Sequence, residues 1–178
     1  LHSFPTRRSS DLSPDRVVPP CAASVECGGC TLQSMAYSAQ LALKQRQVRE
    51  ALSRIGKAQD PGSLIRPIIG MDDPWQYRSK VQFPVAGRAD KPEIGFYAAR
   101  SHQVIHTPFC PIQPPICDTI RDIIAGHMRQ WAIEPYKEDS HSGLLRHIIV
   151  RIGFFTGEVM VGLIVNGDEF PGSKILCE

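Results

Sequence analysis

Three cysteines within ten residues constrain this chain more than any other feature of its sequence. Cys21, Cys27 and Cys30 have the spacing C-x5-C-G-G-C. Gly28 and Gly29 carry no side chain, so this loop can turn tightly and bring backbone N–H groups close to the sulfurs. Three thiols that converge in this way are typical of one metal centre, for which a tetrahedral or cubane arrangement requires a fourth ligand.

Three further cysteines are candidates for the fourth ligand. Cys110 lies in the segment HTPFCPIQPP, between a predicted strand and a predicted helix, where Pro108 and Pro111 restrict the backbone. Cys117 falls close to the apolar stripe of that helix, so we expect a buried structural thiol there. Cys177 lies in the C-terminal tail. The spacing alone supports an iron–sulfur cluster and a structural zinc ion about equally, although a five-residue gap between ligands is less typical of zinc sites.

The composition indicates a cytoplasmic globular protein. The 178 residues suffice for one modest core or two small ones. No apolar stretch is long enough to cross a bilayer, and the N-terminus lacks the apolar region of a signal peptide. Six cysteines in a reducing compartment favour metal ligation over disulfides. The net charge of +2 does not by itself identify a nucleic-acid binder.

Residues 1–12 differ from the rest of the chain. Their sequence, LHSFPTRRSSDL, has neither helical nor strand periodicity, and we interpret it as an artefactual or disordered segment. The remaining residues, 13–178, predict an α+β fold with antiparallel strands, two main helices and the cysteine loop. Helices are expected at 34–55 and 114–131, and strands at 64–69, 76–85, 93–98, 102–106, 145–153 and 158–165. Pro84 places the second of these strands at a sheet edge or a bulge.

Helical spacing predicts which face of each helix is buried. The first helix is expected to bury Tyr37, Leu41, Val48, Leu52 and Ile55. The second is expected to bury Ile116, Ile120, Ile123, Ile124 and Trp131. Basic residues on the first helix are interpreted as a solvated surface.

Several sequence blocks occur in a fixed order and carry a specific resemblance. They are PDRVVPPC, C-x5-CGGC-T-L-Q, DPWQYRSKVQFPV, IGFYAARSHQVIHTPFCPIQ, GLLRHIIVR and TGEVMVGLIVNG. Through them, residues 13–167 resemble the bacterial RNA uracil-5 methyltransferases, in particular the 23S ribosomal RNA (uracil-5-)-methyltransferases. The resemblance implies that Cys21, Cys27, Cys30 and Cys110 bind a four-iron–four-sulfur (4Fe-4S) cluster. It also favours Cys110 over Cys117 as the fourth ligand.

The resemblance covers only one part of that family's architecture. Its members have an N-terminal TRAM domain, a central cluster-bearing domain and a C-terminal Rossmann-like domain that binds S-adenosylmethionine. Residues 13–178 resemble the central domain, truncated at its C-terminal end, with the TRAM and Rossmann-like domains absent. We therefore expect no catalytic residue and no S-adenosylmethionine-binding residue in this chain. The nucleophilic cysteine and the glutamate base of the family belong to the absent part.

Basic residues on the predicted strands and turns are candidates for phosphate contact. They are Arg78, Lys80, Arg100, His102, Arg146, His147 and Arg151. By strand period, Arg78 and Lys80 share one face, Arg146 lies with the apolar Ile148, and His147 lies with Arg151. Tyr77, Phe96 and Tyr97 are candidates for stacking on unpaired bases. For any single residue a solvated sheet rim or a core aromatic is the simpler interpretation. For the whole set the resemblance favours RNA contact.

The expected function follows from the resemblance. We expect a fragment of an S-adenosylmethionine-dependent enzyme that forms 5-methyluridine in 23S ribosomal RNA, inactive alone, with a structural cluster. We expect it to be a monomer that contacts neither DNA nor a membrane. The alternative is a stand-alone RNA-binding or redox module stabilised by iron–sulfur or zinc.

Overall fold

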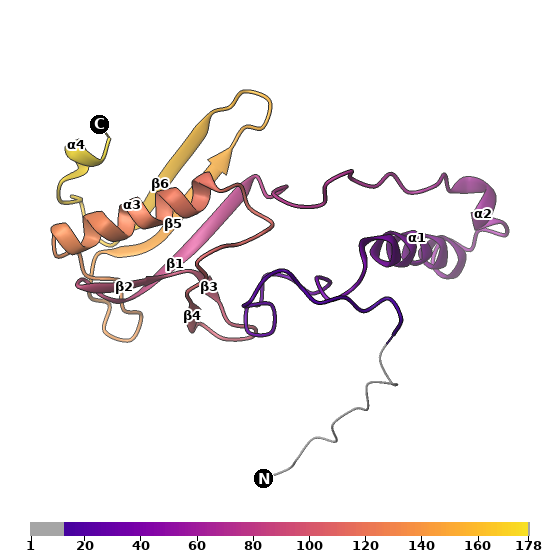
Figure 1. Ribbon diagram of the computed structural model, residues 1–178, viewed down its shortest axis with the longest axis horizontal. Coiled ribbons are helices and arrows are strands. Elements are labelled where there is room, and N and C mark those ends of the chain that lie inside the picture. Colours follow the sequence, from indigo (N-terminus) through magenta and orange to yellow (C-terminus); the bar gives the residue numbers. More distant parts are fainter. Residues whose placement is uncertain (1–12, 178) are drawn as a thin grey trace, which may run out of the picture. The chain divides into compact units, whose positions relative to one another are not determined.

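The computed structural model describes residues 13–177, which fall into two compact units (Figure 1). The first unit holds the described residues up to Pro20 together with Thr31–Pro74. The second holds Cys21–Cys30 and the described residues from Trp75 onward. The predicted artefactual or disordered segment, 1–12, lies outside the described residues. No helix in the described part of the chain has the length and apolarity that a membrane span requires.

The first unit is built around helix α1 (Tyr37–Arg54), which confirms the first predicted helix with slightly shorter bounds. The predicted apolar face is largely uncovered, since Val48 is 52% exposed and Ile55 is 83% exposed. The short helix α2 (Pro61–Leu64) begins at Asp60, whose carboxylate accepts hydrogen bonds from two backbone N–H groups of the first turn.

The predicted strand at 64–69 is wrong. Its residues continue from α2 as an extended segment without a neighbouring strand. The Ile68 N–H donates to Gln45 Oε1 at 3.2 Å, and the Met71 N–H donates to the Tyr37 hydroxyl at 2.8 Å. Side chains of α1 thus take the place of a strand partner for this backbone.

The second unit contains a four-stranded antiparallel sheet with the strand order β2-β1-β5-β6. These strands are β1 (Lys80–Arg88), β2 (Lys91–Ile94), β5 (Leu145–Ile152) and β6 (Val159–Val165). A smaller two-stranded sheet pairs β3 (Phe96–Tyr97) with β4 (Val104–Ile105). The helices of this unit are α3 (Ile116–Gln130) and the short α4 (Ser173–Leu176). The predicted α+β class, with antiparallel strands and two main helices, is confirmed.

Helix α3 packs on one face of the four-stranded sheet and closes the core (Figure 1). From the sheet, Phe83, Leu145 and Ile148 are fully buried. The residues that α3 buries are Cys117, Ile120, Arg121, Ile124, His127 and Met128. This set repeats at three- and four-residue intervals, as one face of a helix does.

The predicted buried stripe of α3 is half wrong. Ile120 and Ile124 are buried as predicted, whereas Ile116, Ile123 and Trp131 are 41%, 55% and 39% exposed. The stripe is rotated because two polar residues, Arg121 and His127, are buried among the apolar ones. His127 stacks on the Phe170 ring, and its Nε2 lies 2.7 Å from the Pro171 carbonyl oxygen.

Pro84 does not mark an edge strand, because β1 lies between β2 and β5. Residues 80–84 of β1 pair with β5, and residues 85–88 pair with β2. Pro84 stands where the strand changes partner, so its missing N–H falls at the junction of the two ladders.

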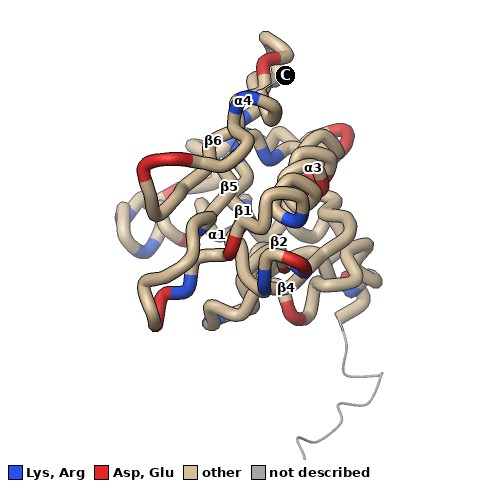
Figure 2. The backbone as a smooth tube through the Cα atoms, turned by 90° about the vertical axis from the view of Figure 1, so that its left-hand side faces the viewer, with Lys and Arg blue, Asp and Glu red and all other residues tan. Residues whose placement is uncertain are grey.

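The register of β5 shifts between Leu145 and His147. The Arg146 side chain therefore lies 46% exposed while Ile148 is fully buried, and the predicted common face of these two residues is wrong. Figure 2 shows basic and acidic positions interspersed around α3 and the strand ends, so charge alone does not mark a nucleic-acid face in this view.

Candidate metal centre and the adjoining pocket

The cysteine loop is fastened to the end of β3. Cys27 forms an isolated antiparallel bridge with Ala98, and the Gly28 N–H donates to the Tyr97 carbonyl oxygen at 3.1 Å. A Cβ atom on Gly28 would lie only 3.1 Å from the Ala99 Cα, so a larger residue would push the two segments apart. The absence of a side chain at this position therefore lets the loop lie directly against β3.

The thiols of this loop lie in a setting suited to ligation. The six cysteines all lie in the described part of the chain, and none forms a disulfide. The Gly29 N–H donates to Cys27 Sγ at 3.4 Å, as the two glycines predicted. Cys21 and Cys110 are buried, whereas Cys27 and Cys30 are half-buried against the same core.

The electrostatics place Cys110 close to the thiols of the loop. Burial raises the pKa of Cys110, and the nearby thiols of Cys30 and Cys21 raise it further. Burial also raises the pKa of Cys21, with smaller contributions from Cys27 and Cys30. An electrostatic interaction thus links the cysteine loop to a thiol about eighty residues later in the sequence.

The described geometry is not a closed site for a single ion. Among residues 13–177, no three histidine, cysteine, aspartate or glutamate side chains lie close enough together to hold one metal ion. Four thiolates around zinc would need sulfurs about 3.8 Å apart, since each Zn–S bond measures about 2.3 Å. The donor set, with thiols outside any disulfide and an N–H group directed at sulfur, fits a thiolate-bound metal group in its chemistry.

A buried arginine anchors the segment that carries Cys110. Arg121 is 3% exposed, and its guanidinium donates to the Thr107 and Pro108 carbonyl oxygens at 2.6 and 3.3 Å. It also forms ion pairs with Asp118 at 2.7 Å and with Asp122 at 2.8 Å. The guanidinium therefore ties the approach to Cys110 onto α3.

Asp118 completes this anchor. Its carboxylate accepts a hydrogen bond from the Cys110 backbone N–H and one from Gln113 Nε2 at 2.9 Å. Burial raises the pKa of Asp118, and Arg121 opposes that shift. Sequence reasoning missed both residues. Their three-residue spacing on the buried face of α3 is the signal that could have found them.

Cys117 lies beside this anchor as a buried thiol, which confirms its predicted structural position. It is fully buried on α3, and burial raises its pKa to about 11. The high pKa keeps this thiol protonated at neutral pH.

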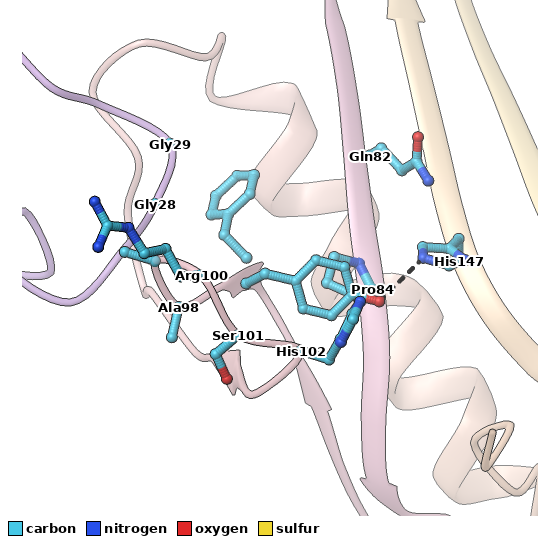
Figure 3. Close-up of a pocket in the computed structure, with 12 residues that line it drawn as sticks. Gly28, Gly29, Gln82, Pro84, Ala98, Arg100, Ser101, His102 and His147 are labelled. Carbon is cyan, nitrogen blue, oxygen red and sulfur yellow. Dashed lines mark hydrogen bonds between the residues drawn. The ribbon is translucent and has the colours of Figure 1, made fainter. Parts of the chain in front are cut away.

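A pocket of about 730 Å³ adjoins the cysteine loop (Figure 3). Its walls come from the cysteine loop, from β1 and β5, and from β3 with the turn that follows it. The lining residues are Gly28, Gly29, Gln82, Pro84, Phe96, Tyr97, Ala98, Ala99, Arg100, Ser101, His102 and His147. This pocket brings together three of the predicted RNA-contacting residues: Arg100, His102 and His147.

Two contacts hold the Tyr97 ring in the pocket. Its hydroxyl lies 3.3 Å from His147 Nε2, and its ring meets His102 edge-on at 5.4 Å between centroids. Burial lowers the pKa of His147, and the adjacent Arg146 lowers it further. His147 is therefore a neutral imidazole at neutral pH, which offers a hydrogen bond rather than a positive charge.

The other four predicted RNA-contacting residues lie apart from the pocket lining. Lys80 and Arg151 are exposed and face each other in register on β1 and β5. Arg146 forms an ion pair with Glu138. Arg78 is half-buried, with its guanidinium 6.0 Å from the Phe96 ring centroid, and its charge lowers the pKa of Cys110.

No protein-family model matches the chain. The chain is 45% identical over 168 residues to an uncharacterized RNA methyltransferase of Halalkalibacterium halodurans, covering 94% of this chain and 36% of that protein. It is 42% identical over 166 residues to an uncharacterized RNA methyltransferase of Clostridium acetobutylicum, covering 93% and 36%. These matches establish homology to bacterial RNA methyltransferases over most of the chain.

A solved structure shares the fold. The Pyrococcus abyssi tRNA (uracil-54, C5)-methyltransferase, crystallised with S-adenosyl-L-homocysteine, matches with a TM-score of 0.68 and 22% identity. The match covers 92% of this chain and 35% of that one. The chain thus spans just over a third of the length of the relatives it matches.

Proposed function

We propose that this chain is the cluster-bearing central part of an RNA uracil-5 methyltransferase that forms 5-methyluridine in 23S ribosomal RNA in the cytoplasm. The homology to RNA methyltransferases supports the reaction class. The S-adenosyl-L-homocysteine bound by the Pyrococcus abyssi protein supports S-adenosylmethionine as the methyl donor of the whole enzyme. The observation that carries the proposal is the C-x5-C-G-G-C loop, whose Cys21 and Cys30 interact electrostatically with Cys110.

In this proposal, Cys21, Cys27, Cys30 and Cys110 hold a 4Fe-4S cluster. The cluster supplies a cross-link, because it closes a loop of about eighty residues and so restricts the unfolded chain. Methyl transfer from S-adenosylmethionine needs no redox partner, so a structural role accounts for the site.

The residues around the thiols prepare them for this role. Arg121 and Asp118 fix the segment that carries Cys110, while Gly28 lets the cysteine loop lie against β3. Arg78 adds a positive charge near Cys110, which favours the thiolate form that ligation requires. The part of the enzyme that binds the methyl donor and attacks the uracil lies, in this proposal, outside this chain.

The cluster is tested by anaerobic purification followed by iron and sulfide assays and visible absorption. We expect a brown protein with iron and sulfide in equal amounts. Cys110→Ser should lose the absorption, and Cys117→Ser, the matched control, should keep it. A colourless protein with stoichiometric zinc, or the reverse behaviour of the two variants, would contradict the ligand set.

The reaction is tested on the full-length protein. It should transfer a labelled methyl group from S-adenosylmethionine to C5 of a uridine in 23S RNA. The 178-residue chain alone should transfer none. Modification of transfer RNA in place of ribosomal RNA would overturn the proposed substrate and leave the reaction class standing.

A further inference from the structure

The pocket beside the cysteine loop is a second site, separate from the thiols. We propose that it takes one unpaired nucleotide of single-stranded RNA, with the base against Tyr97, the base edge at Gln82 and the phosphate at Arg100. The inference deepens the proposed function and rests on it, because it names the chemistry by which this unit contacts RNA.

Tyr97 gives the pocket a stacking surface. The residue is 37% exposed and lines the pocket. The contact of its hydroxyl with His147 holds the ring in one orientation, so stacking a base costs little side-chain entropy. An aromatic face of this kind binds unpaired bases of any sequence. Phe96 and Pro84, both buried, close the floor beneath it.

Gln82 supplies the polar edge. It lies exposed on β1, opposite Ile149 of β5, on the face of the sheet away from the core. Its amide carries one acceptor and two donor hydrogens, and it hydrogen-bonds to no other side chain in the described part of the chain. An amide of this kind pairs with the donor and acceptor groups of a base edge.

Arg100 supplies the charge. It adopts a left-handed backbone conformation with φ of 59° in a tight turn, in which the Ser101 N–H donates to the Ala98 carbonyl oxygen. Its side chain is exposed and in Figure 3 extends away from Gln82 and His147, and none of the lining residues is acidic. The pocket therefore favours a phosphate over a basic peptide.

The occupant must be unpaired. A base inside a duplex is stacked on both faces and paired along its edge, so it cannot present either surface to Tyr97 and Gln82. Gly28 and Gly29 form the wall opposite the sheet. The loop that carries three of the thiols therefore also contributes to the nucleotide pocket.

The test uses the whole 178-residue chain, reconstituted anaerobically with iron and sulfide. Binding of a fluorescein-labelled heptauridylate is measured by fluorescence anisotropy, with a short blunt-ended RNA duplex as competitor. We expect the single strand to bind and the duplex to compete poorly. Tyr97→Ala should weaken binding at least about fivefold, the lower end for loss of one base–aromatic stack.

Matched variants separate the pocket from the rest of the surface. Phe154→Ala, which removes an aromatic ring 54% exposed outside the pocket, should leave the affinity unchanged. Gln82→Ala should weaken binding without disturbing the core, and it decides the case if Tyr97→Ala does not fold. Arg100→Asn preserves the left-handed turn and should lower the salt slope of the binding constant by about 0.7.

Photocrosslinking locates the bound strand directly. Heptauridylate that carries 4-thiouridine should crosslink to the peptide spanning residues 96–102. Crosslinks confined to other peptides, equal losses for Tyr97→Ala and Phe154→Ala, or no binding by the reconstituted chain would each overturn the site. Cluster absorption is recorded on the same samples. Loss of RNA binding with intact cluster absorption would overturn the nucleotide site and leave the proposed function standing. RNA binding without cluster absorption would overturn the proposed cluster and leave the nucleotide site standing.

Discussion

Replacement of Arg121 by methionine tests whether the buried anchor beneath Cys110 stabilises the fold. Methionine keeps an unbranched apolar stem of similar length and removes the guanidinium. The Arg121 side chain is 4% exposed and that of Asp118 is 15% exposed, so the lost ion pair is well shielded from water. The carbonyl oxygens of Thr107 and Pro108 lose their donor at the same time.

The expected loss in the free energy of unfolding depends on the interactions that Asp118 and Asp122 keep. Removing one partner of a buried ion pair destabilises a protein by about 3–5 kcal/mol. Asp118 keeps its hydrogen bonds from Gln113 and from the Cys110 backbone, and the Asp122 side chain is 65% exposed. These remaining interactions favour the lower end, about 3 kcal/mol at neutral pH.

The cost should depend on pH. Burial raises the pKa of Asp118 above its ordinary value of 3.8, and loss of Arg121 raises it further. Between 3.8 and the folded pKa, the native state binds more protons than the unfolded state, so stability falls as pH rises through that window. The gap between the wild type and Arg121→Met should therefore be larger at about pH 8 than at about pH 5.

Urea denaturation followed by circular dichroism measures this difference at both pH values. Arg129→Met, an exposed position on the same helix, is the matched control and should change stability by about 0.5 kcal/mol or less. Adding Asp118→Asn to Arg121→Met should recover part of the loss, because it removes the stranded charge. Equal effects of Arg121→Met and Arg129→Met, or a gap independent of pH, would refute the reasoning.

Two further predictions concern the core of the second unit. Cys117 is fully buried and its pKa is raised to about 11, so it should react with iodoacetamide only on unfolding. The exposed Cys177 should react at once in the native protein. Mass spectrometry of the modified peptides measures both, and rapid modification of Cys117 in the native protein would contradict the prediction. Phe83→Ala should destabilise the unit by about 3–5 kcal/mol, while Phe155→Ala, at a fully exposed ring, should cost about 0.5 kcal/mol or less; similar urea midpoints for the two would contradict the assigned core.

Local periodicity predicted the elements whose partners are near in sequence. The strands predicted at 145–153 and 158–165 are present and pair across a short turn that contains Gly157. The strand predicted at 64–69 failed because a short apolar run becomes a strand only beside another strand. No pattern within six residues shows whether such a neighbour exists.

Buried polar residues explain the errors on α3. An apolar stripe predicts the buried face when only apolar residues are buried. Here Arg121 and His127 are buried through partners in the 107–108 and 170–171 segments, which no helical spacing reveals.

The candidate site was predictable in its parts more than in its assembly. The cysteine spacing and the two glycines between Cys27 and Cys30 predicted a ligand loop. The choice of Cys110 as fourth ligand came from the resemblance and remains a prediction. Three basic residues of the pocket, Arg100, His102 and His147, were named from sequence, but their meeting depends on two segments that are distant in sequence. The neutral state of His147 follows from burial and from the charge of Arg146, which become visible only in the fold.

The attachment of Cys110 to α3 restrains its backbone more than that of the three cysteines in the loop. The backbone around Cys110 is held in place by Arg121 and Asp118. Just beyond Cys110, the Arg78 N–H donates to the Ile112 carbonyl oxygen. The other three cysteines lie on the glycine-containing loop 21–30, which backbone hydrogen bonds attach to the end of β3. If these thiols bind a metal group, Cys110 would be the ligand with the least backbone freedom, and residues 21–30 would supply the three ligands that can adjust their positions.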